Sequence, residues 1–153
     1  MNDMIFPTYV ANNFLHRAFT QNVPVTPMKL QRLIYFLYKE YYKRTGEILF
    51  SEQFQTWRTG PVLSSLYAKF GCSGTERIRN YAKDSKGKVR RVTETRTFKE
   101  SIDKVWALYG NYSEISLSQL FMSANTAWSK AVLNKQLYLD LENIKDEPEL
   151  YAN

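Results

Sequence analysis

The spacing of apolar residues along the chain predicts a mostly helical protein. In most of the sequence, apolar side chains recur every three to four positions, the period that gives an α-helix one buried face. The predicted helices are residues 8–21, 26–46, 60–70, 97–110, 116–121, 127–133 and 139–144. Residues 47–58 lose this period, and aromatic residues among Ser, Gln and Thr there indicate a short extended stretch or hairpin. We therefore expect a mainly α fold with a small β element (α+β), folded as a single compact helical domain.

Capping residues mark the ends of several predicted helices. Thr26 and Pro27 open the second helix, because a Thr hydroxyl accepts from free amide groups and proline needs no amide hydrogen at the first position. Gly46 ends this helix, since glycine readily takes the left-handed conformation of a helix C-terminus. Pro61 is expected in the first turn of the third helix. The sequence Thr-Phe-Lys-Glu at 97–100 is a capping box and predicts another helix start.

Positive charge is concentrated in one segment. The 153 residues carry a formal net charge of +6, yet residues 77–99 alone hold 9 basic and 2 acidic residues. We interpret the chain, residues 1–153, as one domain with a basic variable insert at about 73–96 and an acidic tail at about 140–153. The local excess of positive charge favours an anionic partner or an acidic protein surface.

Three interpretations of the basic stretch stay open at the level of sequence. It is a solvated and partly mobile insertion, a surface for an acidic protein, or a contact to nucleic acid. Residues 75–83 have a weak helical pattern, and residues 88–95 fit a strand or a mobile loop. Tyr81 is the only aromatic residue between Arg77 and Arg96, so the stacking platforms of single-strand binders are missing. Its basic residues are Arg77, Arg79, Lys83, Lys86, Lys88, Arg90, Arg91, Arg96 and Lys99.

Catalytic and metal-binding motifs are missing from the sequence. It holds no Gly-rich phosphate loop, no His-Glu-x-x-His and no Cys-x-x-Cys, so we expect no cofactor, no metal and no enzyme. The single histidine, His16, lies beside the apolar face of the first helix and is interpreted as a boundary residue. A small enzyme that uses His16 is the competing hypothesis. The single cysteine, Cys72, is interpreted as a plain thiol.

The predicted location is the cytoplasm. The N-terminal residues lack the basic start of a secretory signal, and no apolar run approaches the ~20 residues that a membrane span requires. One cysteine excludes an intrachain disulfide framework. We therefore expect a cytoplasmic protein with no membrane partner.

Aromatic residues are the unusual feature of the composition. The chain has 11 Tyr, 9 Phe and 3 Trp, and five of these occupy more than one face of the second predicted helix. Some must pack in the core, while exposed tyrosines are typical of protein interfaces. The expected partner-binding residues, from this helix and the basic insert, are Tyr38, Tyr42, Arg77, Arg79, Lys88, Arg90 and Arg91.

Three blocks of sequence, in this order, resemble the Panacea domain family. Residues 26–36, TPMKLQRLIYF, are similar to the family's opening Lys-Leu-Gln helix, and residues 54–62, FQTWRTGPV, to its Trp-x-x-Gly-Pro-Val block. A weaker block runs from 105 to 128, and the likeness covers roughly residues 7–144. The family includes SocA-like antitoxins and phage-associated proteins of the GepA type. The motif residues, as scaffold or contact, are Lys29, Gln31, Tyr35, Trp57, Gly60, Pro61 and Trp128.

The resemblance implies a non-enzymatic interaction protein that binds and neutralises a toxin or a host effector protein. It also implies two variants, an adaptor that delivers its toxin to a protease and a phage-encoded inhibitor of a host defence system. The residues alone leave a further alternative, a nucleic-acid-binding regulator that uses the basic insert. Family members often carry Thr-His before Pro-Trp, whereas Met122-Ser123 stand near that position here. A role tied to that histidine is therefore not transferred.

Overall fold

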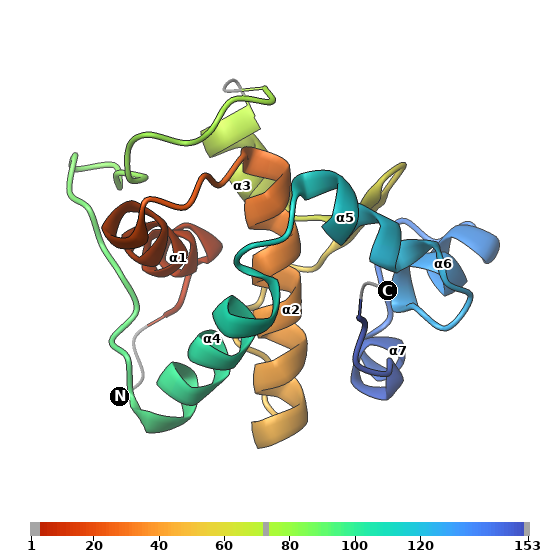
Figure 1. Cartoon of the computed structure of the whole chain (residues 1–153). Helices are drawn as coiled ribbons and strands as arrows, with labels where there is room; N and C mark the ends of the chain where they lie inside the picture. Colours follow the sequence, from red (N-terminus) through yellow and green to blue (C-terminus); the bar gives the residue numbers. More distant parts are fainter. Residues whose placement is uncertain (1–3, 72–73, 152–153) are drawn as a thin grey trace.

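Helix α2 (Pro27–Thr45) lies at the centre of the fold and contacts most of the other elements. The computed structural model describes residues 4–71 and 74–151. In Figure 1, α1 and α4 flank α2 on one side, and α5, α6 and α7 lie on the other. These elements are α1 (Pro7–Gln21), β1 (Gln55–Trp57), β2 (Gly60–Val62), α3 (Ser64–Phe70), α4 (Arg96–Tyr109), α5 (Glu114–Gln119), the 3-10 turn η2 (Leu120–Met122), α6 (Ala127–Leu133) and α7 (Leu141–Asp146). The predicted mainly α fold with a small β element is confirmed.

Helix α2 begins and ends as the sequence predicts. The Thr26 side chain accepts a hydrogen bond from the Lys29 amide (3.3 Å), Pro27 is the first helical residue, and Gly46 closes the helix with φ 74°. Between these caps, every residue from 29 to 39 is buried. A helix buried on every face needs partners for its polar side chains as well as for its apolar ones.

Aromatic rings fill the space around α2. The Tyr35 ring lies 5.2 Å from both Phe54 and Phe121, edge to face, and the Phe36 ring stacks on Tyr109 at 4.1 Å. Such pairs contribute about 0.5–1.5 kcal/mol each beyond the burial of their area. Much of the aromatic excess therefore belongs to the core.

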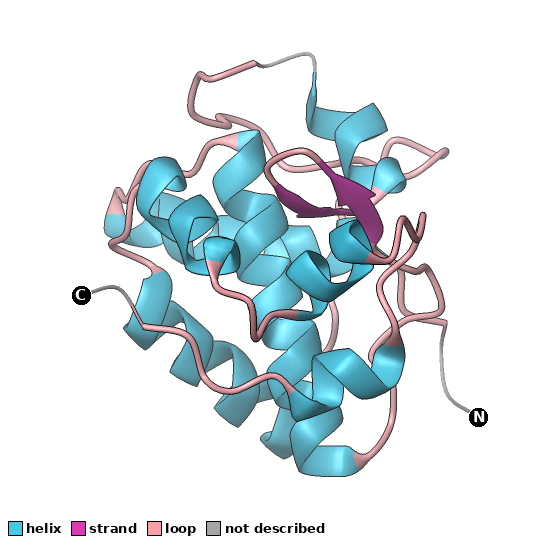
Figure 2. Cartoon of the chain, turned by 90° about the vertical axis from the view of Figure 1, so that its right-hand side faces the viewer, coloured by secondary structure: helices cyan, strands magenta, loops and turns pink. Residues whose placement is uncertain are grey.

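Strands β1 and β2 form an antiparallel hairpin, with Trp57 opposite Gly60 (Figure 2). A third segment continues this small sheet on the other side of β1, because the Thr56 amide donates to the Leu137 carbonyl (2.8 Å). The extended stretch or hairpin expected within residues 47–58 is confirmed, with its second strand lying just beyond that range.

The predicted helix start at Pro61 is wrong. Gly60 and Pro61 belong to β2, and α3 begins only at Ser64. Gly60 has φ 141°, which a helix does not allow, and the Leu63 amide is bound by the side chain of Gln31 (2.9 Å). Proline fits the strand because this position of the hairpin needs no amide donor.

Helix α4 begins at Arg96, one residue before the predicted capping box at 97–100. The Glu100 carboxylate, expected to reach back to the helix start, instead accepts from Arg96 (3.1 Å) and Arg44 (3.2 Å). Attraction to these two guanidinium groups decides its position.

Residues 74–95, here called the strap, cross α1 as an irregular segment (Figure 1). The helical pattern of 75–83 is therefore overturned. Two buried side chains of α1 bind backbone groups of the strap, as a neighbouring β-strand would do. Asn12 accepts from the Ala82 amide and donates to the Ala82 carbonyl, both at 2.9 Å, and Asn13 binds Val92 in the same way at 2.8 and 2.9 Å.

Two of the three acidic residues of the strap, Asp84 and Glu94, are paired within the fold. The Glu94 carboxylate accepts from both terminal nitrogens of Arg17 (2.8 and 2.9 Å), and this pairing lowers the pKa of Glu94. The Asp84 carboxylate accepts from Arg90 (2.7 Å) and from two amides of its own turn, which lowers the pKa of Asp84 to about 2. Glu76 is exposed, so the strap keeps one acidic side chain at its surface against a larger number of exposed cations.

The C-terminal segment is fastened to α2 by a buried ion pair. The Glu147 side chain is fully buried, and its carboxylate accepts from the Lys39 ammonium (2.6 Å), the Tyr35 hydroxyl (3.0 Å) and the Ala127 amide (2.8 Å). Lys43 also donates to the Glu147 carbonyl. One carboxylate thus joins α2, the start of α6 and the chain end.

The ion pair gives a prediction about stability. Glu147→Gln leaves the Lys39 charge buried and unpaired, and Lys39→Met does the same to the Glu147 charge. Each variant should lower the free energy of unfolding by about 3–5 kcal/mol. The double variant leaves neither charge and should lose less than the sum of the two. Urea denaturation of the wild type, the two single variants and the double variant measures these free energies of unfolding.

The exposed neighbour Lys145 supplies the control for this cycle. Lys145→Met should change the free energy of unfolding by less than about 0.5 kcal/mol. Strictly additive losses in the Lys39–Glu147 double variant would show that the two groups do not interact.

The asparagine contacts give a second prediction. Asn12→Ala or Asn13→Ala leaves strap amide and carbonyl groups without partners. The free energy needed to open the strap should therefore fall by about 1–3 kcal/mol. Trypsin should then cut at the strap's Lys and Arg residues at least about tenfold faster, as followed by mass spectrometry. Exposed Asn80 provides the control, because Asn80→Ala should leave the rate unchanged. Equal rates in all variants would contradict this role of the asparagines.

Candidate partner-binding site

The Lys-Leu-Gln motif of α2 holds other segments by their backbone. The Lys29 ammonium donates to the carbonyls of Gly110 (2.6 Å) and Pro24 (3.2 Å), and burial lowers the pKa of Lys29. The Gln31 side chain donates to the Leu63 carbonyl (3.0 Å) and accepts from the Leu63 amide (2.9 Å). Both motif side chains are buried, so their position is that of scaffold residues.

Arg32, which is not among the predicted site residues, is enclosed by the hairpin turn. Its guanidinium donates to the Thr59 carbonyl (2.9 Å) and hydroxyl (3.1 Å), to the Pro61 carbonyl, and to the Ser118 hydroxyl (3.4 Å). A Cβ atom at Gly60 would lie 2.8 Å from the Arg32 Cζ. Glycine therefore serves here both for its positive φ and for this close approach.

The Arg32 hydrogen bonds described above all go to neutral oxygen atoms. Burial lowers the pKa of Arg32 to about 10, and the nearby carboxylate of Glu114 opposes that change. The guanidinium therefore stays charged at neutral pH.

The aromatic motif residues complete this framework. The Tyr35 hydroxyl donates to Glu147 (3.0 Å), and the Trp128 indole donates to the Trp57 carbonyl (2.6 Å). The Trp57 indole donates to the Gln55 side chain (2.8 Å). Of the seven motif residues, Trp57 alone is half-buried, whereas the other six are buried. Their contacts bind parts of the chain to one another.

Tyr38 is not on the surface, contrary to expectation. Its side chain is 2% exposed and its ring lies 5.0 Å from Phe50 and 5.1 Å from Phe54. Burial raises the pKa of Tyr38 to about 12. Every face of α2 is covered at this level, so a partner does not reach this ring. Tyr42, one turn later, is half-buried and keeps part of its side chain at the surface.

The strap carries two kinds of cation. Arg90 is paired with Asp84, and Arg77 is half-buried and donates to the Asn22 side chain (3.2 Å). The remaining cations are exposed and follow one another along the strap: Arg79, Lys83, Lys86, Lys88 and Arg91. Arg79, Lys88 and Arg91 thus stand exposed along the strap, whereas Tyr42 lies on α2.

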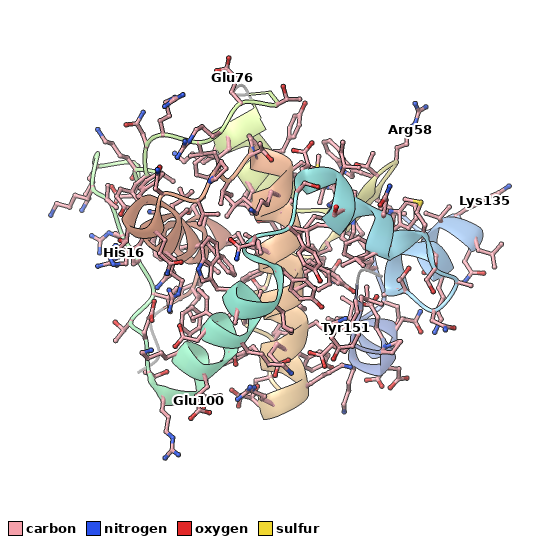
Figure 3. The ribbon with its side chains drawn as sticks, viewed as in Figure 1. His16, Arg58, Glu76, Glu100, Lys135 and Tyr151 are labelled. Carbon is pink, nitrogen blue, oxygen red and sulfur yellow. The ribbon has the colours of Figure 1, made fainter. Side chains whose placement is uncertain are left out.

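His16 is exposed on α1, beside the strap (Figure 3). It lines an open groove of about 720 Å³ together with Arg91 and Lys99, and its Nδ1 lies 3.5 Å from the Tyr81 hydroxyl. Cys72, interpreted above as a plain thiol, lies outside the described residues.

Residues 4–71 and 74–151 contain neither a metal-binding cluster nor a helix suited to a membrane. No group of three or more His, Cys, Asp or Glu side chains in these ranges is arranged to hold a metal ion. Over the same described residues, none of the helices combines the length and apolar character needed to cross a bilayer.

Sequence signals for the unpredicted contacts differ in strength. Arg32 interrupts the apolar run of α2, and a polar side chain within a buried run needs a buried partner, so this position was readable as a hydrogen-bonding site. Asn12 and Asn13 stand off the apolar face of α1, so the sequence pattern gave no sign that they are buried. Glu147 carries no such signal, because it stands among other acidic residues of the tail.

Comparison with known proteins places these motifs in a family. The family described as "Antitoxin SocA-like, Panacea domain" matches residues 30–129. The protein named Antitoxin SocA from Caulobacter vibrioides (strain NA1000 / CB15N) is 33% identical over 73 residues, which are 48% of this chain and 39% of that relative. The matched region thus spans less than half of the relative's length. No solved structure matches the chain. Because the family match covers well over half of its residues, this chain belongs to the SocA-like antitoxin family with the Panacea domain.

Proposed function

We propose that this protein is an antitoxin that neutralises a toxin protein by binding it directly, without chemistry of its own. The match to the SocA-like antitoxin family carries the proposal. The packed scaffold supports it, because side chains that bind internal backbone groups hold the surface in one shape before a partner arrives. Such preorganisation lowers the entropy cost of association.

The strap is the proposed contact surface for this toxin. Its exposed cations stand on a segment fixed by Asn12 and Asn13, and two of its three carboxylates, Asp84 and Glu94, are already paired. A fixed positive surface attracts an acidic partner and speeds the encounter with it. Tyr42 is the one proposed aromatic contact that retains exposed surface.

An acidic protein suits this surface better than a nucleic acid does. The strap is irregular, so it offers no helix to enter a DNA groove. Its aromatic residue, Tyr81, is half-buried with its ring 4.9 Å from Phe19, and so it does not offer a free ring on which bases stack. We therefore assign the exposed cations to protein recognition.

Charge reversal on the strap tests the proposal. Arg79→Glu, Lys88→Glu and Arg91→Glu together change exposed cations and leave the Asp84–Arg90 pair intact. In cells that also express a toxin candidate chosen from the neighbouring genes, the triple variant should fail to restore growth. With purified proteins at low salt, its Kd for that candidate should rise at least about tenfold.

A matched control reverses three cations elsewhere, at Lys130, Lys135 and Lys145. This protein has the same net charge as the strap variant and should restore growth like the wild type. Filter binding to duplex and single-stranded DNA at two salt concentrations tests the competing function, which is nucleic-acid binding. Tight, salt-dependent DNA binding that the strap variant loses, with no effect on toxicity, would contradict the antitoxin proposal.

A further inference from the structure

A groove beside the hairpin turn exposes mainly apolar atoms, although most of its lining residues are polar. It lies between the N-terminal turn of α2, the β1–β2 turn and the α5–η2 segment, and its volume is about 440 Å³. Met28, Ile115 and Met122 are among its walls, and the last two are 69% and 59% exposed. Exposed apolar side chains gathered at one place are typical of interaction sites, and methionine adapts to different shapes. The volume suits insertion of apolar side chains from another molecule.

The charges around this groove are mainly positive. Arg58 stands at its rim on the hairpin turn, and Figure 3 shows its side chain projecting away from the hairpin. Arg32 lies behind it, since the groove residues Thr59 and Ser118 accept hydrogen bonds from its guanidinium. The groove thus has one guanidinium group at its rim and another behind it, against one lining carboxylate, that of Glu114. The Glu114 carboxylate is in turn held by the Thr26 hydroxyl (2.6 Å).

We infer that this groove docks a segment of the protein partner in which an apolar side chain stands next to a carboxylate. The apolar side chain enters between Ile115 and Met122, and the carboxylate pairs with Arg58. Arg32 adds to the attraction, because its charge acts through protein rather than through water. The inference rests on the proposed function in so far as the natural partner is a protein.

Groove and strap divide the recognition between them. The strap is polar and exposed, so it serves mainly for the rate of encounter and for selecting acidic partners. A buried apolar anchor contributes more to affinity than rim charges do. Nucleic acid does not suit the groove, since a phosphate backbone has nothing to bury against Met28, Ile115 and Met122.

Peptides provide a test that does not need the toxin. Random 12-residue peptides displayed on phage are panned against the full chain. The selected peptides should carry Leu, Ile, Met or Phe within about four residues of Asp or Glu, the reach of one helical turn or a short extended segment. One of them, synthesised with a fluorescent label, should bind the wild type. Ile115→Lys, Met122→Lys and Arg58→Glu should each raise its Kd at least about tenfold.

Two exposed residues outside the groove supply matched controls. Ile48→Lys places the same change as Ile115→Lys on another surface, and Lys135→Glu reverses a distant cation. Both should leave the peptide Kd within about twofold, since exposed substitutions away from a site have small effects. Circular dichroism checks that every variant stays folded.

The outcomes separate the groove from the antitoxin function. No selected peptide, peptides without acidic residues, or binding that the three groove variants leave unchanged overturns the groove. Any of these results alongside restored growth in the toxin assay overturns the groove alone. If the three groove variants weaken peptide binding but the protein does not neutralise the toxin candidate, the groove is supported and the proposed antitoxin function is overturned.

Discussion

The fold depends on satisfying the polar side chains of a helix that is buried on every side. Lys29, Gln31, Arg32 and Lys39 all lie within the buried part of α2. A buried charge or amide without a partner costs several kcal/mol, so each of these groups must find an oxygen or an amide elsewhere in the chain. The partners come from the α1–α2 connection, the hairpin, the end of α4 and the C-terminal segment. Meeting this need fixes how distant segments lie against α2.

This constraint explains why the two family blocks occur together. The Lys-Leu-Gln block and the Trp-x-x-Gly-Pro-Val block are separated in sequence, but Gln31 binds the Leu63 backbone and Arg32 occupies the space that Gly60 leaves open. A side chain at Gly60 would displace the guanidinium, and loss of the guanidinium would leave the hairpin carbonyls without their donor. The blocks are the two halves of one contact. In this chain their residues hold the hairpin against α2.

Recognition then falls to surfaces that this framework holds in place. The strap lies over α1 and the groove lies beside the hairpin turn, and both border elements anchored to the core. In our proposal the strap supplies charge, which acts over several ångströms, and the groove supplies apolar contact, which acts only on close approach. A binding protein with these two kinds of contact can select a partner without a catalytic group.

The sequence by itself determined the helices, their approximate bounds, the basic segment and the family blocks, because these depend on local periodicity, capping and composition. Tertiary structure decided what local rules cannot express. Pro61 entered a strand because Gln31 and Arg32 bind the hairpin, and Glu100 left its capping role for two arginines. Tyr38 went to the core because α2 is covered on all faces, and the strap took its path from Asn12 and Asn13. Each of these outcomes depends on residues far apart in the chain, so the pattern around any one of them carries too little information to predict it.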